Sequence, residues 1–205
     1  GMPLQANRAA IMQNVGAVIE KPAMYEYLTA YQNLKIFSAL SGVSKTRLQL
    51  LHELDVVGLA ARAHDLVRTF SQGMKQRLAI AIAMVNDPQL ILLDEPTNGL
   101  DPQGIADIRN LILHLSREQG KTVLVSSHLL SEIEQVATRL IIIDKGCKLV
   151  EGDSKELFDT SKTVVAIQTL DNKQATELLL QSSWAAQLLV NRSTDKEIFM
   201  QLDEK

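Results

Sequence analysis

Residues 90–101 read LILLDEPTNGLD, and this stretch decides the fold. Its four apolar residues, 90–93, have the length and the unbroken hydrophobicity of a strand that is buried inside a sheet. Asp94 and Glu95 follow at the carboxyl end of that strand, and Pro96 begins a turn. Because open sheets of parallel strands bind ligands at this edge, the stretch predicts a ligand site around the two acids.

The acid pair is suited to phosphate chemistry. The first acid, Asp94, can hold Mg²⁺ through its water, and the second, Glu95, can orient an attacking water molecule. An isolated Asp-Glu pair is equally compatible with a strand that ends in acids before a proline turn. The neighbouring motifs therefore have to decide between the two interpretations.

Apolar strands alternate with amphipathic helices on both sides of this stretch. Residues 15–19 are a short apolar run that leads into the loop Glu20-Lys21-Pro22. Asp101-Pro102 pairs an N-cap with proline at the first helical position, and residues 122–126 and 140–143 are further apolar runs. This alternation predicts an α/β fold, with a parallel sheet covered by helices on both faces.

Two regions depart from the alternation. Residues 28–70 are predicted to form a helical insert, because Thr29 and Gln32 make a capping box at the start of a helix. Ser44 is predicted to cap the next helix. The inward face of that helix would carry Leu48, Leu51, Leu54 and Val57.

The C-terminal tail has a strand–helix–strand pattern of its own, and we expect it to form a small β-α-β appendage. We therefore predict two domains, residues 1–161 and residues 162–205.

Ser71-Gln72-Gly73-Met74 opens a helix that is apolar nearly all round, which is typical of a buried helix. Free backbone N–H groups, the positive end of the helix dipole and the Ser71 hydroxyl together make an anion site. Gly73 would let a phosphate approach the backbone closely. A serine N-cap without any ligand is the plainer alternative.

His128 follows the apolar run 122–126. Parallel topology places it at the same sheet edge as Asp94 and Glu95, within reach of a γ-phosphate. A lone histidine after a strand is also compatible with a residue that only starts a helix or packs against one.

Composition excludes several classes of function. The net charge of −3 gives no electrostatic reason to expect a nucleic-acid partner. The single cysteine excludes an internal disulfide, and no Cys/His cluster has metal-ligand spacing. No apolar run approaches the roughly 20 residues of a membrane-spanning helix, so we expect a cytoplasmic protein.

Taken in order, these motifs resemble those of the ABC ATPase family from about residue 15 to residue 153. Phe70 to Met74 matches the family signature, which ordinarily reads Leu-Ser-Gly-Gly-Gln. Residues 90–95 match the Walker B strand with its catalytic glutamate, Asn98 to Asp101 matches the D-loop, and His128 matches the switch histidine.

Three departures accompany this resemblance. Gln72 stands where the family usually has glycine, and Met74 stands where it usually has glutamine. Glu20 occupies the position of the family's Q-loop glutamine. The run from Ile19 to Pro22, together with the small C-terminal appendage, resembles the bacitracin-efflux and lantibiotic-immunity type of exporter.

The resemblance implies a P-loop-NTPase-like fold and an ATP-hydrolysing subunit that couples hydrolysis to membrane export. The intact family member would bind ATP and Mg²⁺, which we expect this chain to bind weakly or not at all. Its partners would be a transmembrane permease subunit and a second ATPase subunit at the inner face of the membrane. Glu95 and His128 would be catalytic, and Asp94 would hold the metal. The nucleotide-binding residues would be Ser71, Gln72, Gly73, Met74, Asp101 and Glu20.

The phosphate-gripping motif of the family, Gly-x-x-x-x-Gly-Lys-Ser/Thr, does not occur in the 205 residues. Gly1 ahead of Met2 has the form of a residue left by tag cleavage, which favours a truncation in the gene. We therefore expect the chain to be inactive alone, and either to self-associate or to have a rearranged sheet. A non-catalytic remnant that binds a permease or a sister subunit is the alternative. A soluble ABC ATPase of DNA repair or translation fits less well, since neither coiled-coil insertions nor tandem domains are present.

Overall fold

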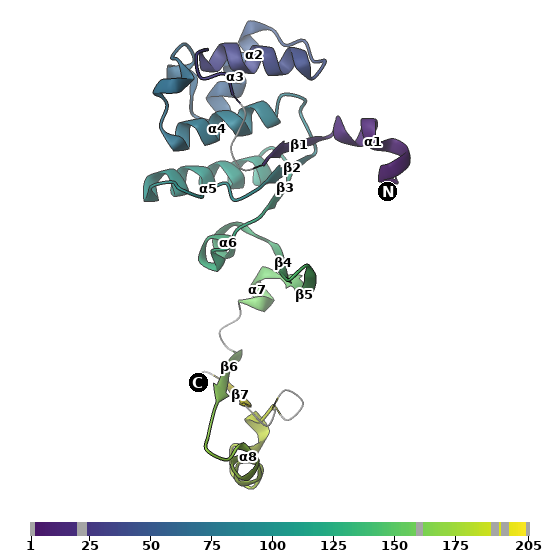
Figure 1. The fold of residues 1–205 in the computed structure, drawn as a ribbon, viewed down its shortest axis with the longest axis vertical. Helices are drawn as coiled ribbons and strands as arrows, with labels where there is room; N and C mark the ends of the chain where they lie inside the picture. Colours follow the sequence, from purple (N-terminus) through teal and green to yellow (C-terminus); the bar gives the residue numbers. More distant parts are fainter. Residues whose placement is uncertain (1–2, 20–23, 159–161, 190–192, 194–196, 204–205) are drawn as a thin grey trace. The chain divides into compact units, whose positions relative to one another are not determined.

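The computed structural model describes residues 3–19, 24–158, 162–189, 193 and 197–203 (Figure 1). The chain forms two compact units, Gly1–Val136 and Ala137–Lys205. The predicted domains, 1–161 and 162–205, divide the chain at a different place, and they stay a prediction.

The first unit contains a parallel sheet of three strands in the order β1-β2-β3 (Figure 1). The strands are β1 (Val15–Val18), β2 (Leu90–Leu93) and β3 (Thr122–Val125). Helices lie between consecutive strands along the chain, which confirms the predicted α/β class.

One face of this sheet is covered and the other is open. The rows Gly16–Ile91–Val123 and Val18–Leu93–Val125 lie on the covered face, where Val18, Ile91 and Leu93 are at most 4% exposed. The alternate row Ala17–Leu92–Leu124 lies on the other face, and Leu124 is 59% exposed. The prediction that helices cover both faces is therefore confirmed for one face only, among the residues that the structure describes.

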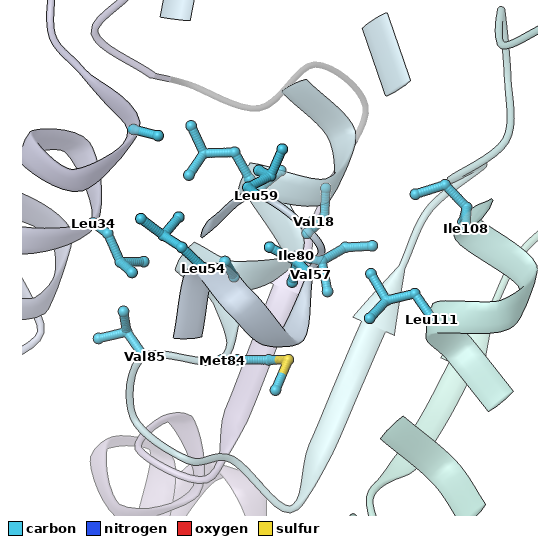
Figure 2. Packing of buried hydrophobic residues seen from close by; sticks show 14 of the residues in the cluster. Val18, Leu34, Leu54, Val57, Leu59, Ile80, Met84, Val85, Ile108 and Leu111 are labelled. Carbon is cyan, nitrogen blue, oxygen red and sulfur yellow. The ribbon is translucent and has the colours of Figure 1, made fainter. Parts of the chain in front are cut away.

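Helices α4 (Gln72–Ala83) and α5 (Pro102–Arg117) cover the buried face. Figure 2 shows Ile108 and Leu111 of α5 reaching toward the cluster that contains Val18. Close approach of α4 explains Gly16, because a Cβ atom there would lie 2.2 Å from the carbonyl oxygen of Ala83.

The helical insert begins with α2 (Ala30–Leu40), and Thr29 and Gln32 form the predicted capping box. Helix α3 (Arg47–Val56) begins later than predicted, because Thr46 caps it together with Gln49.

The predicted cap at Ser44 is therefore wrong. Leu54 of the predicted inward face is buried together with Leu50, whereas Leu48, in the first turn of the observed helix, is 80% exposed. Two short 3₁₀ turns, η1 (Ala60–Arg62) and η2 (Val67–Thr69), connect the insert to α4.

The remaining elements of the first unit are α1 (Leu4–Met12) and α6 (Leu130–Val136). None of the helices that the structure describes is long and apolar enough to cross a membrane.

The second unit contains two antiparallel strand pairs. Strand β4 (Arg139–Asp144) pairs with β5 (Cys147–Asp153), and the one-turn helix α7 (Ser154–Leu157) follows. The isoleucines of β4 at positions 141 to 143 are 39% to 66% exposed. The two strands form a two-stranded sheet of their own, and the expected rearrangement of the sheet stays a prediction.

The tail has the predicted strand–helix–strand order. Strands β6 (Lys162–Ile167) and β7 (Ile198–Asp203) pair antiparallel, with α8 (Asn172–Leu180) and the turn η3 (Ala185–Gln187) between them. Its buried cluster is small, with Leu188, Ile198 and Met200 at its centre.

Candidate active site

The two acids lie at the carboxyl edge of the parallel sheet, as predicted. The backbone N–H of Asp94 donates to the carbonyl of Val18 at 2.9 Å, and that of Ser126 donates to the carbonyl of Leu93 at 3.0 Å. These bonds extend both strand pairings one residue beyond the strands. Asp94 and Ser126 are thereby held side by side at the edge.

Glu95 and His128 meet at this edge. The Nδ1 atom of the imidazole lies 3.0 Å from Oε2 of the carboxylate. The Glu95 side chain is 33% exposed and that of His128 is 66% exposed, so both groups are open to solvent and to a ligand. Two of the predicted catalytic residues are therefore in direct contact.

Ser126 joins the two acids, and sequence reasoning missed it. Its Oγ donates to Oδ1 of Asp94 at 2.6 Å and accepts from the backbone N–H of Glu95 at 2.9 Å. The signal available in the sequence was its place as the last residue of the predicted strand 122–126, where parallel register sets it beside Asp94.

Glu95 has a φ of 44°, in the left-handed region that favours glycine. A non-glycine residue in this conformation costs of order 1–3 kcal/mol and is found most often at functional sites. This conformation changes the direction of the Glu95 side chain immediately after the strand, so that its carboxylate contacts His128.

The turn that follows the acids is tied to the helix that follows His128. The Thr97 hydroxyl donates to the Glu132 carboxylate in the first turn of α6. The Ser127 hydroxyl accepts from the backbone N–H of Leu129. Both contacts restrain the chain on either side of His128.

The predicted anion site at residues 71–74 forms a capped helix start. Ser71 caps α4, and its hydroxyl accepts from the backbone N–H of Met74 at 3.3 Å. Gln72 is exposed, and Gly73 is half-buried. Within the described residues, no hydrogen bond joins this segment to Asp94, Glu95 or His128.

Asp101 caps α5, and its Oδ1 accepts from the backbone N–H of Gly104 at 3.1 Å. The two helix starts lie close together, because a Cβ atom at Gly73 would be 3.8 Å from Cα of Gly104. The predicted site residues that the structure describes therefore lie in two places. The catalytic and metal-binding residues lie at the sheet edge, and the nucleotide-binding residues lie at the two adjacent helix starts.

Glu20 lies outside the described residues. Glu151 lies on β5 in the second unit, next to two basic side chains. The hydrogen bond from Lys148, the charge of that lysine and Arg139 hold the pKa of the Glu151 carboxyl below its ordinary value.

Asp94 fits a magnesium ion that is shared with a nucleotide. Its Oδ1 is occupied by Ser126, and its Oδ2 has no hydrogen bond within the described part of the chain. No group of three or more His, Cys, Asp or Glu side chains in that part could hold a metal by itself. Mg²⁺ is commonly bound by one or two carboxylates together with substrate phosphates, and Asp94 could supply such a carboxylate.

Residues 1–98 match the family model described as ABC transporter. The chain is 40% identical over 180 residues to the bacitracin transport ATP-binding protein BcrA of Enterococcus faecalis, covering 87% of this chain and 58% of that protein. It is 44% identical over 142 residues to the lantibiotic transport ATP-binding protein SrtF of Streptococcus pyogenes, covering 69% of this chain and 61% of that protein. The chain thus spans less than two thirds of the length of either relative.

Solved structures share the fold. cbiO1 of Clostridium perfringens, part of the ABC transporter complex cbiONQ, superposes with a TM-score of 0.64 at 21% identity, covering 83% of this chain and 64% of that chain. The ATP-binding cassette MJ0796, in a dimeric state bound to ADP and Pi, superposes with a TM-score of 0.62 at 26% identity, covering 75% of this chain and 68% of that chain. The predicted P-loop-NTPase-like fold class is confirmed.

Proposed function

We propose that this chain is an ABC transporter protein that supplies part of the ATP-hydrolysing subunit of an exporter, because residues 1–98 match the family model described as ABC transporter. The observation that carries the proposal is the contact of Glu95 with His128, beside Asp94, at the carboxyl edge of a parallel sheet. The bacitracin and lantibiotic transport relatives support an exporter of that type.

The residues at the edge divide the chemistry among them. The Glu95 carboxylate accepts a hydrogen bond from the attacking water molecule and orients it toward the γ-phosphate. His128 contacts that carboxylate through Nδ1 and holds it in place, and as an imidazolium it would also donate to the phosphate oxygens from Nε2. When bound, Mg²⁺ neutralises charge on the phosphates, and Asp94 is the residue that would hold it through water.

The N-termini of α4 and α5 would bind the nucleotide that is held by a second ATPase subunit. Ser71, Gln72, Gly73 and Met74 present a hydroxyl and backbone N–H groups at the positive end of α4, which suits the phosphates of ATP held by a second ATPase subunit. Asp101, which caps α5 next to Gly73, and Glu20 of the Q-loop would complete the nucleotide contacts between the two subunits.

The chain is inactive alone in this proposal. The main phosphate grip of the family is absent from the 205 residues, so Glu95 and His128 have no nucleotide placed against them. Activity requires the complete ATPase subunit to which this chain belongs, including the phosphate grip that would hold a nucleotide against Glu95 and His128. It also requires a second ATPase subunit and a transmembrane permease subunit, and the complex lies on the inner face of the cell membrane. No nucleic-acid partner is proposed.

Self-association of the chain belongs to the same proposal. The open face of the sheet carries Ala17, Leu92 and Leu124, and the outer edges of β1 and β3 have no partner strand within the described residues. An apolar face beside free strand edges favours association with a second copy.

The alternative is a non-catalytic remnant that binds a permease or a sister subunit. ATP turnover by an assembled transporter that contains this chain separates the two functions. Glu95→Gln removes the charge that orients water and keeps the shape, whereas Ser71→Arg fills the anion site of α4.

Loss of turnover in the Glu95→Gln variant is expected from the proposed function. Loss in the Ser71→Arg variant alone would support the remnant, which then only completes a sister subunit's site. Turnover by the purified chain without any partner would contradict both.

A further inference from the structure

We propose that Ser126 is a positioning residue for both acids of this edge, which deepens the proposed function and rests on it. Its single hydroxyl fixes which oxygen of Asp94 faces the metal. The same hydroxyl holds the peptide of Glu95 in the conformation that brings its carboxylate to His128.

The direction of each hydrogen bond follows from the groups involved. The backbone N–H of Glu95 can only donate, so Oγ of Ser126 accepts from it at 2.9 Å. The hydroxyl proton is then available for Oδ1 of Asp94, which lies 2.6 Å away. Oδ1 is thereby occupied, and Oδ2 is the oxygen left for Mg²⁺ or for water bound to it.

The same hydroxyl interrupts the parallel hydrogen-bond pattern between β2 and β3. Because Ser126 N–H donates to Leu93, regular parallel pairing would next join the N–H of Glu95 to the main-chain carbonyl of Ser126. Instead, the side-chain oxygen of Ser126 accepts that N–H. The chain can then leave the strand at Glu95, where φ reaches 44°.

Packing does not explain Ser126. The residue is exposed, and it continues the open-face row that includes Leu124. Removing its hydroxyl should therefore change the two hydrogen bonds at the edge and leave the buried cluster untouched.

The test compares Ser126→Thr with Ser126→Val in the 205-residue chain, because these two side chains have nearly the same shape and differ in the hydroxyl. The first readout is hydrogen exchange of the Glu95 amide by NMR, referred to the Ile91 amide in the buried part of β2. We expect exchange to be about 3- to 10-fold faster in Ser126→Val, the factor that one lost hydrogen bond allows, and unchanged in Ser126→Thr.

The second readout is the carboxyl ¹³C resonance of Asp94. It should move in Ser126→Val and keep the parent position in Ser126→Thr, since threonine restores the donor. Equal exchange rates and equal resonance positions in the two variants would overturn the proposal.

Neither readout needs ATP, so the result is separate from the proposed function. ATP turnover of the assembled transporter that is unchanged by Glu95→Gln would contradict the function. The exchange rates would still decide whether Ser126 positions the two acids.

Discussion

The two faces of the three-stranded sheet carry similar residues and have different surroundings. On one face, Val18, Ile91 and Leu93 are at most 4% exposed beneath α4 and α5. On the other face, Leu124 is 59% exposed although it is as apolar as its neighbours. An apolar residue in a strand therefore indicates only that the position can be buried. Whether it is buried depends on which helices pack against that face of the sheet.

The proposed active site lies where the two faces end. Asp94 and Ser126 come two residues after Leu92 and Leu124 and so lie on the same open face of the sheet. Their side chains are joined there by a hydrogen bond. In a regular strand, Glu95 would lie on the covered face, like Leu93, but its left-handed backbone conformation directs it out of the sheet. The open face thus runs directly up to the residue proposed to hold the metal.

Truncation of the covered face should have the largest effect. Ile91→Ala removes a side chain that is 0% exposed, and we expect it to lower the free energy of unfolding by about 2–5 kcal/mol. Leu124→Ala on the open face is the matched control and should cost less than about 1 kcal/mol. Urea unfolding followed by circular dichroism measures both, and equal losses would show that the two faces are equally buried in solution.

A charge on the open face should weaken self-association. Leu124→Lys introduces a positive charge that a second copy would have to desolvate. We expect the dimer to weaken by about 1.5–3 kcal/mol, the contribution of one buried leucine side chain that the substitution removes. Sedimentation velocity measures the effect.

Leu48→Lys is the control, because Leu48 is exposed on α3, away from the sheet. Equal association constants for the two lysine variants would show that the open face is not the surface of contact.

Adding carbon atoms should lower the free energy of unfolding on the covered face much more than on the open face. Gly16→Ala places a Cβ atom 2.2 Å from the Ala83 carbonyl oxygen on the covered face, and we expect a loss of about 1–3 kcal/mol in unfolding free energy. Ala17→Val adds carbon to the open face at the next residue and should change stability by less than about 0.5 kcal/mol. Thermal unfolding compares them, and a tolerated alanine at position 16 would mean that α4 does not approach β1 so closely.

The smallest effect is expected where the chain leaves the sheet. Glu95→Gly and Glu95→Ala both remove the contact with His128, but only glycine adopts a φ of 44° without strain. The glycine variant should be more stable than the alanine variant by about 1 kcal/mol. The reverse order in chemical denaturation would argue against a left-handed residue at this position.

Much of the first unit could be predicted from local patterns. The stretch 90–101 predicted a buried strand, an acid pair at its end and a helix capped by Asp101, and all three are present. Thr29 with Gln32 predicted the start of α2, because a capping box is a local hydrogen-bond pattern. His128 could be placed beside Glu95, because parallel topology brings strand ends together.

The features that could not be predicted are of two kinds. Some depend on contacts between segments far apart in the sequence, and others on a choice between similar local signals. Ser44 and Thr46 are both good N-caps, and the capping partner Gln49 decided for the second. The open face could not be foreseen, because periodicity does not say how many layers cover a sheet. Ser126 was missed because its role needs the register between two strands, which local patterns do not supply.

The most direct test of the account is ATP turnover by the assembled transporter with Glu95 or with Glu95→Gln in this chain. If the edge with Asp94, Glu95 and His128 carries the hydrolytic step, Glu95→Gln should lower the turnover number by about 100-fold or more and leave ATP binding intact. Turnover at the parent rate in the Glu95→Gln transporter would contradict the account.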